Sequence, residues 1–445
     1  MEGLRAYESE LLSKWADNPE ITYTQLKEFL EQEHGRTCSK HTMQHWMQRP
    51  FKTALMVSAD VLCGRSSLSG GKRFRSNSWP HGYGPDRFGD YIRVLTSLDD
   101  CTAKLWHKVS NCTPTLGGHT EEGGHTKDLS FSVFSPDDGW YILTASYDCT
   151  AKIWNSITGD CIRTLRGHTD FVFSALFSMN MHCVVTASRD RTAKIWNAKT
   201  GDCIQTLSHT DAVHYAVFSP SGRAVLTISD DIATIWHVDS GYCSHTLSGH
   251  TEPVNTAVYS QDGTAVVTAS EDMTAKVWNA STGECTMTLR HRHTVESAVF
   301  SQGGGFVLTA SADGTAKLWG ALEGDFIQVY GHNRKVHSAV FSKDDDTVLT
   351  ASLDGTAKLW NMTSGNLLQT FSGHTAGVAS AVFSRDGALL LTTSYDQTAK
   401  VWDADTGECI KTLKADTVAV FACGDYGRRY GDYCLDERPR ILWRD

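Results

Sequence analysis

Residues 373–413 read GHTAGVASAVFSRDGALLLTTSYDQTAKVWDADTGECIKTL, and related stretches recur along most of the 445-residue chain. The stretch holds four short runs rich in β-forming residues, separated by turn clusters of Asp, Gly and Ser. This pattern predicts a four-stranded antiparallel meander. The third run of each copy ends on a tryptophan, at Trp106, Trp154, Trp196, Trp236, Trp278, Trp319, Trp360 and Trp402.

These tryptophans are 40 to 48 residues apart. Self-similarity at this spacing is typical of a radial β-architecture. The phrase Thr-Ala-Lys-Val-Trp places bulky side chains on both faces of its strand, so we expect neighbouring sheets to cover both faces. The chain is therefore predicted to be mainly an all-β propeller.

The repeat resembles the WD40 repeat family, because it has Gly-His at its start, Ser-x-Asp before the third strand and Trp at that strand's end. The resemblance covers residues 91–413. It implies a buried chain of hydrogen bonds in which the indole N–H bonds Ser, Ser bonds His and His bonds Asp. The matching quartets are His168/Ser188/Asp190/Trp196, His250/Ser270/Asp272/Trp278, His332/Ser352/Asp354/Trp360 and His374/Ser394/Asp396/Trp402. A trio of Ser, His and Asp that recurs in repeat after repeat indicates architecture and not a catalytic triad.

The number of blades is open between eight, which we prefer, and seven, which is common in the family. Residues 91–106 supply a second and a third strand but no clear first strand. Residues 417–423 match the missing innermost strand in pattern. A ring that stays open exposes sheet edges, so we expect one C-terminal strand and three N-terminal strands to complete an eighth blade. The propeller is assigned to residues 91–445.

The N-terminal residues 1–50 have a helical pattern instead. Leu4, Tyr7, Leu11 and Trp15 share one helical face, and further helices are expected to begin near Thr22 and Ser39. This segment resembles the DNA-binding helix-turn-helix of transposases and recombinases. The residues that the third helix would present to a major groove are Lys40, His41, Gln44, His45, Gln48 and Arg49.

A basic stretch overlaps this all-α module. Residues 35–76 contain eight Lys or Arg and one acid, whereas the whole chain has a formal net charge of −10. Such a stretch either contacts phosphates or is a solvated linker, and the Ser/Gly-rich residues 51–90 are assigned as a linker. DNA binding is therefore an alternative function. It predicts salt-sensitive binding of duplex DNA by the chain, weakened by Lys40→Ala and Arg49→Ala in fluorescence anisotropy.

The resemblance also predicts a binding surface, because in this family the loops after Gly-His and the residue before the quartet Asp lie on one face. Phe, Tyr and Arg among charged residues fit a protein-binding hot spot; the alternative is variable loop residues with no shared role. The positions before the Asp are Tyr147, Arg189, Glu271, Ala312, Leu353 and Tyr395. Those from the loops after the His are Lys127, Asp170, Phe171, Glu252, Arg334 and Lys335.

The sequence contains no Gly-rich phosphate loop, metal-spaced cluster or isolated nucleophile, so we expect no enzyme activity, cofactor or metal. Five of the cysteines recur at one repeat position and form no Cys-x-x-Cys pairs, which predicts free thiols. No signal peptide or membrane span is expected, and the location is predicted to be cytoplasmic or nuclear. The predicted function is a monomeric, non-enzymatic scaffold that binds other proteins.

Overall fold

The computed structural model describes residues 58–59, 93–98, 103–107, 113–116, 124–136, 140–384, 387–414, 419–424 and 434–435. The chain divides into two compact units, Met1–Ala54 and Leu55–Asp445, and all described residues lie in the second. The helix-turn-helix module predicted for residues 1–50 lies outside the described residues, as does most of the linker 51–90. Both stay predictions.

Seven four-stranded antiparallel sheets follow one another along the second unit, each built from four consecutive strands. We number them sheet 1 to sheet 7. Sheet 1 contains β5 (Leu129–Phe134), β6 (Tyr141–Ser146), β7 (Thr150–Asn155) and β8 (Cys161–Arg166). Sheet 2 contains β9 (Val172–Phe177), β10 (Cys183–Ser188), β11 (Thr192–Asn197) and β12 (Cys203–Ser208). Sheet 3 contains β13 (Tyr215–Phe218), β14 (Ala224–Ser229), β15 (Ile232–His237) and β16 (Cys243–Leu247).

The remaining four sheets have the same plan. Sheet 4 contains β17 (Val254–Tyr259), β18 (Ala265–Ser270), β19 (Thr274–Asn279) and β20 (Cys285–Arg290). Sheet 5 contains β21 (Val295–Phe300), β22 (Phe306–Ser311), β23 (Thr315–Gly320) and β24 (Phe326–Gly331). Sheet 6 contains β25 (Val336–Phe341), β26 (Thr347–Ser352), β27 (Thr356–Asn361) and β28 (Leu367–Ser372). Sheet 7 contains β29 (Val378–Phe383), β30 (Leu389–Ser394), β31 (Thr398–Asp403) and β32 (Cys409–Lys414).

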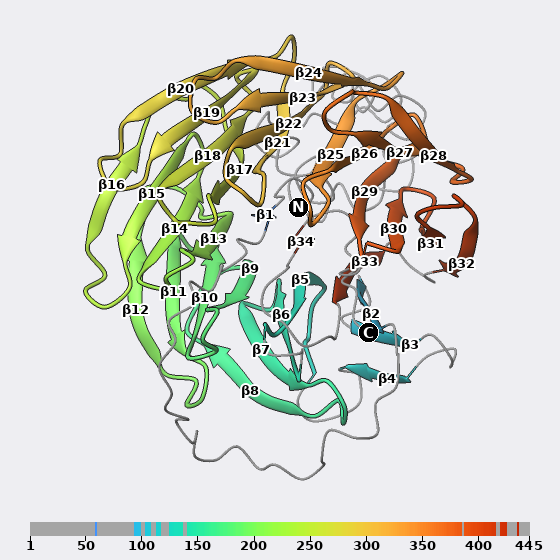
Figure 1. The fold of residues 1–445 in the computed structure, drawn as a ribbon. Helices are drawn as coiled ribbons and strands as arrows, with labels where there is room; N and C mark the ends of the chain where they lie inside the picture. The colour runs from blue at the N-terminus through green and yellow to red at the C-terminus, as the bar shows by residue number, and fades with distance from the viewer. Residues whose placement is uncertain are drawn as a thin grey trace, which may run out of the picture. The chain divides into compact units, whose positions relative to one another are not determined.

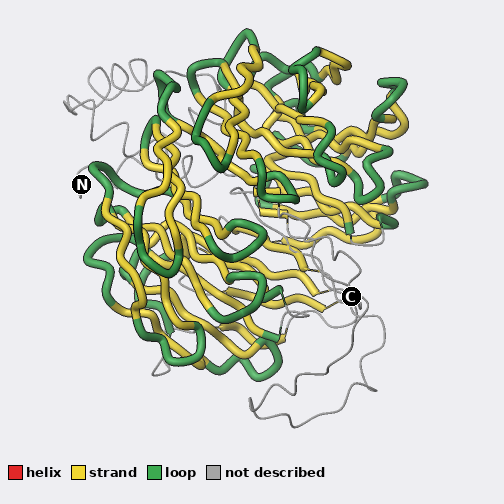
Figure 2. Tube along the Cα trace, turned by 60° about the vertical axis from the view of Figure 1, so that its left-hand side comes forward, coloured by secondary structure: helices red, strands yellow, loops and turns green. Residues whose placement is uncertain are grey.

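A further four-stranded sheet joins distant parts of the chain. Strand β33 (Ala419–Gly424) pairs antiparallel with β2 (Arg93–Leu98), which is followed by β3 (Ala103–His107) and β4 (Thr113–Leu116). A two-stranded pair consists of β1 (Ser58–Ala59) and β34 (Cys434–Leu435). Strands and loops make up the described residues, as Figure 2 shows.

The sheets stand around a common centre, with the first strand of each sheet innermost and the fourth outermost (Figure 1). Neighbouring sheets pack through their inner strands, as β17 does against β21 and β25 does against β29. Burial follows this order. All six residues of β17 are buried, whereas only Leu289 is buried in the outermost strand β20.

The expectation that both faces of the Trp-bearing strand are covered is confirmed. In β19, Thr274, Ala275, Val277 and Trp278 are all buried, although they alternate between the two faces. The side chains of adjacent sheets therefore meet in shared apolar clusters. One such cluster contains Val267 of sheet 4 together with Trp319 of sheet 5.

Candidate functional site

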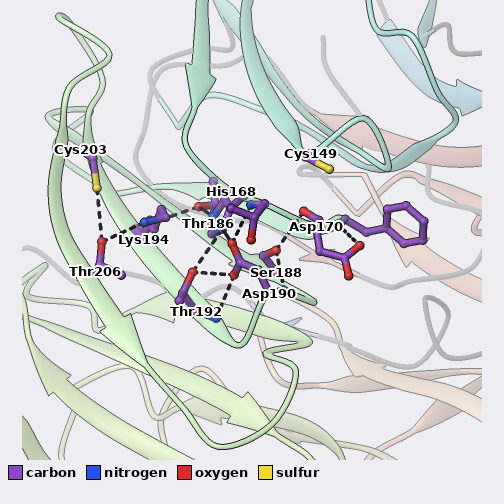
Figure 3. Close-up of polar contacts among 12 residues, drawn as sticks. Cys149, His168, Asp170, Thr186, Ser188, Asp190, Thr192, Lys194, Cys203 and Thr206 are labelled. Carbon is purple, nitrogen blue, oxygen red and sulfur yellow. Dashed lines mark hydrogen bonds and ion pairs between the residues drawn. The ribbon is translucent and has the colours of Figure 1, made fainter.

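A chain of hydrogen bonds links the tryptophan of sheet 2 to the loop end of the sheet, and Figure 3 shows its His168, Thr186, Asp190 and Thr192 members. Trp196 Nε1 donates to Thr186 Oγ1 over 2.8 Å, and His168 Nε2 lies 2.7 Å from the same hydroxyl oxygen. His168 Nδ1 is 2.8 Å from Asp190 Oδ2, and the Thr192 hydroxyl donates to Asp190 Oδ1 over 2.6 Å. The same Trp–Thr–His–Asp chain recurs in sheets 1, 4, 5, 6 and 7.

The predicted role of serine in this chain is wrong, because threonine supplies the hydroxyl. In the β10–β11 register, Trp196 lies opposite Val184, and Thr186 is its diagonal neighbour. Ser188 lies on the same face but about 7 Å further along the strand, beyond the reach of the indole N–H. The same correction applies to Ser270, Ser352 and Ser394.

The serines instead fix the turn that carries the aspartate. Ser188 Oγ accepts the backbone N–H of Asp190 and donates to the carbonyl of Asp170, both over 3.1 Å. The quartet His and Asp residues therefore have their expected roles, with Thr in place of Ser. The signal for the threonine was present in the sequence, since each of the seven repeats has Thr two residues before its Ser.

The protonation states of the histidine and the aspartate in this hydrogen-bond chain follow from their donors and acceptors. Burial would raise the pKa of Asp354, but hydrogen bonds from His332, Thr356 and a backbone amide hold that pKa well below its usual range. The carboxylate is thus an acceptor only, and His332 Nδ1 carries the proton. Burial also lowers the pKa of His332, which leaves it neutral, with Nε2 free to accept the Thr350 hydroxyl.

This directed chain is structural. The hydroxyls of Thr144, Thr186, Thr268 and Thr350 belong to residues with no exposed surface, so a substrate cannot reach them. Each hydroxyl already accepts an indole N–H and donates to histidine. The arrangement satisfies every buried polar group that it contains, and such networks rigidify a fold.

Glycine before the histidine has a packing reason. A Cβ atom on Gly167 would lie 3.3 Å from the ring of Trp196, and its φ of 150° also disfavours other residues. Gly167 follows β8 of sheet 1, whereas Trp196 belongs to sheet 2. The indole of Trp196 therefore lies between the two sheets, next to the backbone of Gly167.

Sheet 3 departs from this pattern. Trp236 and His209 both bond the hydroxyl of Thr227, but His209 Nδ1 is 3.2 Å from the carbonyl of Leu207. The β14–β15 turn, Asp230-Asp231, is one residue shorter than its counterparts. Burial lowers the pKa of His209 to about 4, with the Leu207 carbonyl as the partner of Nδ1.

Five of the predicted surface residues come together at the loop end of sheets 1 and 2; we name Lys127, Tyr147, Asp170, Phe171 and Arg189 the Phe171 cluster. The Tyr147 and Phe171 rings are 4.9 Å apart between centroids. Lys127 Nζ and Arg189 Cζ lie 5.3 Å and 5.6 Å from the Phe171 ring centroid. Arg189 Nε is also 3.7 Å from Asp170 Oδ2. Cations at these distances interact with the face of an aromatic ring.

A second group at this face includes two residues that the sequence analysis missed. Lys335 Nζ is 2.6 Å from Oε1 of Glu296, a side chain that is only 1% exposed. His337 Nδ1 lies 4.0 Å from the other oxygen, and the Tyr395 hydroxyl is 3.3 Å from His337 Nε2. Lys335 therefore forms an ion pair within the protein. Glu296 and His337 occupy β-bulges of β21 and β25, where a polar residue interrupts an apolar run.

The other predicted surface residues lie at the same end of their sheets. Glu252 and Arg334 are exposed in the loops before β17 and β25, and their carbonyls accept Ser270 and Ser352. Glu271, Ala312 and Leu353 follow the second strands of sheets 4, 5 and 6. The DNA-binding candidates Lys40, His41, Gln44, His45, Gln48 and Arg49 lie outside the described residues.

In the described part of the chain, no group of three or more His, Cys, Asp or Glu side chains is arranged to hold a metal ion. The same residues include no helix of the length and apolarity that a membrane crossing requires. The recurring cysteines Cys161, Cys203, Cys243, Cys285 and Cys409 are free thiols, as predicted. A cytoplasmic or nuclear location stays a prediction.

Stacked four-stranded meanders with a repeated Trp–Thr–His–Asp chain define a β-repeat protein. A family model described as "WD domain, G-beta repeat" matches residues 110–155, 159–197, 201–237, 241–279, 283–320, 324–361 and 365–403. These matches cover more than half of the chain, and the chain belongs to the WD40 repeat family. WD40 repeats generally act as scaffolds for protein interactions.

A computationally designed protein, Ika8, is similar in structure. It shares 25% sequence identity with this chain at a TM-score of 0.59, and the match covers 72% of this chain and 97% of that one. A comparison with curated proteins gives no match. The family repeat is offset from the sheets, since residues 159–197 contain β8 of sheet 1 and β9 to β11 of sheet 2.

The corrected hydrogen-bond chain predicts which hydroxyl matters for stability. Thr268→Val should leave the Trp278 indole N–H and His250 Nε2 buried without partners. We expect the free energy of unfolding to fall by about 3 kcal/mol, measured by urea unfolding and circular dichroism. Ser270→Ala is the matched control and should cost about 1 kcal/mol. A larger loss in the serine variant would contradict the assignment.

The buried histidines predict acid sensitivity. Burial lowers the folded-state pKa of His209 from 6.5 to about 4 and also lowers those of His125, His250, His291 and His332. Between about pH 4 and pH 6.5 the unfolded chain binds more protons, so stability is present above pH 6.5 and falls as the pH falls. Thermal unfolding should show a lower Tm at pH 5 than at pH 7.5.

A matched pair of variants isolates the contribution of His209. His209→Gln should remove about 2 kcal/mol of the loss between pH 7.5 and pH 5. His237→Gln replaces an exposed histidine and should leave the pH profile unchanged. Equal profiles for wild type and His209→Gln would contradict the assignment of His209 as a neutral buried base.

Proposed function

We propose that this chain is a non-enzymatic scaffold that binds other proteins at the loop end of its sheets, with the Phe171 cluster as the principal contact. The observation that carries the proposal is the half-buried pair of Tyr147 and Phe171, flanked by the cations of Lys127 and Arg189. Interface hot spots are enriched in aromatic residues and arginine. This composition suits a protein segment that offers an apolar side chain next to a carboxylate.

The buried hydrogen-bond chain supports this role because it holds the contact loop in place. Asp190 accepts the backbone N–H of Thr169 over 3.0 Å, and Ser188 donates to the carbonyl of Asp170. The backbone N–H of Arg189 donates to the carbonyl of Phe171 over 2.9 Å. The cluster is therefore ordered before a partner arrives, and preorganisation lowers the entropic cost of binding.

Substitution of Phe171 tests the proposal. Partners captured by the tagged full-length chain from its native source would be identified, and the affinity of each purified partner measured by calorimetry. We expect Phe171→Ala to weaken binding by about 30-fold, the size of a hot-spot effect. Tyr242→Ala is the control, because Tyr242 is a 67% exposed aromatic at the opposite end of its sheet. Unchanged affinity in Phe171→Ala, or equal loss in Tyr242→Ala, would contradict the assignment.

We further infer that the ring closes with eight sheets. The pairing of β33 with β2 supports this, and both strands also pack against β5 of sheet 1. One apolar cluster includes Phe131 of sheet 1 and Leu391 of sheet 7, from opposite ends of the seven matched repeats. In a closed ring of eight sheets, the innermost strand of every sheet would have a neighbouring sheet on both sides.

Two C-terminal truncations test the closure. A chain that ends at residue 414 lacks β33 and should have a Tm lower by several degrees, because β2 loses one of its two antiparallel partners and keeps only β3. A chain that ends at residue 424 retains β33 and should melt close to the full-length protein. Equal melting of both truncated chains would contradict closure by β33.

A further inference from the structure

The outermost strand of each sheet is an edge, since within the described residues it is hydrogen-bonded to one neighbouring strand only. Exposed edges invite pairing with other chains, and proteins usually protect them with charges. Five of the seven edges begin with Cys, and six have Thr at the fourth position. Strand β24 has Phe326 and Val329 at these positions.

Strand β24 combines exposed apolar side chains with an absence of charge. Phe326, Ile327 and Val329 are 55%, 44% and 44% exposed, and the sequence FIQVYG has no ionisable acid or base other than Tyr330, which is buried. The next edge along the ring, β28, is also uncharged and exposes Leu367 and Leu368. Together these two edges form the largest set of exposed apolar residues on the described rim.

The lysine of the third strand distinguishes β24 and β28 from the edges of sheets 1, 2, 4 and 7. In sheets 1, 2, 4 and 7 this lysine bonds the Thr hydroxyl of the edge strand, as Lys276 Nζ does with Thr288 over 3.0 Å. Val329 offers no hydroxyl, and Lys317 Nζ instead donates to the carbonyl of Arg290 over 3.1 Å. The ammonium group that would cover the edge therefore bonds the neighbouring sheet.

An edge backbone group of β24 is satisfied only locally. The N–H of Val329 donates to Oε1 of the adjacent Gln328 over 3.2 Å. The backbone carbonyl of an incoming strand can replace this side-chain oxygen as the acceptor at a small cost in free energy. The carbonyl of Gly331 already accepts Lys358 Nζ over 3.1 Å, so the available pairing segment is residues 326–330.

We propose that β24 pairs antiparallel with β24 of a second copy of this chain, which gives a twofold-symmetric dimer. The charge pattern favours this occupant. Self-pairing of β24 brings no like charges together, whereas self-pairing of β8 or β32 would oppose arginines or lysines. Strands β12 and β28 are also uncharged, but β24 exposes more large apolar side chains than either. The turn residue Leu322, which is 92% exposed, adds apolar area beside the pairing segment. This inference replaces the expectation of a monomeric propeller and is independent of the Phe171 cluster.

Sedimentation equilibrium of the full-length chain tests the dimer. We expect a reversible monomer–dimer equilibrium between about 1 and 100 μM, a range in which edge pairing of modest area is measurable. Ile327→Lys should weaken dimerisation by at least about tenfold, because it places like charges opposite each other. The matched control is Ile204→Lys on β12, which changes an equally exposed isoleucine at the same repeat position.

A second measurement locates the interface without substitutions. Hydrogen exchange of the β24 amides in the wild-type chain should slow as protein concentration rises, while exchange in β12 stays constant. A wild-type chain that is monomeric at 100 μM would overturn the proposal. So would equal weakening by Ile327→Lys and Ile204→Lys, or concentration-dependent protection confined to another edge.

Discussion

The indole N–H of each tryptophan must find an acceptor in the dry space between two sheets, and much of the architecture follows from this requirement. In sheet 4, Thr268 accepts from Trp278 and gives its own proton to Nε2 of the neutral His250. His250 in turn donates its Nδ1 proton to Asp272, whose charge is stabilised by hydrogen bonds from a hydroxyl and from backbone amides. The need for an acceptor between the sheets is thus linked, through successive hydrogen bonds, to the conformation of the loops at the end of the sheet.

Much of this fold can be read from the repeat spacing, because strands, turns and their order are all local patterns. The identity of the bonding hydroxyl is different. Thr268 and Ser270 lie on the same face two residues apart, and only the register against Trp278 distinguishes them. Sequence alternation cannot supply that register. A count of hydroxyl positions would have favoured threonine, since the partial repeat 91–106 has Thr96 ten residues before its Trp106 but Leu98 at the position of the serine.

For the surface residues, too, part of the arrangement could be predicted from the sequence and part could not. Repeat position correctly assigns Tyr147, Phe171 and Arg189 to one end of the sheets, because equivalent positions share an orientation. Their mutual contact depends on how sheets 1 and 2 pack together, which is a tertiary property. Glu296 and His337 were missed because a β-bulge breaks the alternation on which face assignment depends.

Some positions of the repeat have the same residue in nearly every copy, whereas others differ from copy to copy. Positions that contact the neighbouring sheet are nearly invariant among the seven copies, such as the Ala before the lysine of the third strand. The loop ends and the edge strands differ from copy to copy, as Val329 in place of Thr illustrates. The residues between the sheets specify one fold, while the residues on its outer surfaces vary without disturbing that packing.

The pairing of β33 with β2 joins residues 419–424 to residues 93–98, and this has a consequence for how the protein is made. A ribosome releases β2 and β3 long before β33 exists. Throughout that interval β2 can pair with β3, but its other edge has no partner. The pairing of β2 with β33 cannot form before residues 419–424 are made, and a translation product that stops earlier keeps an exposed strand edge.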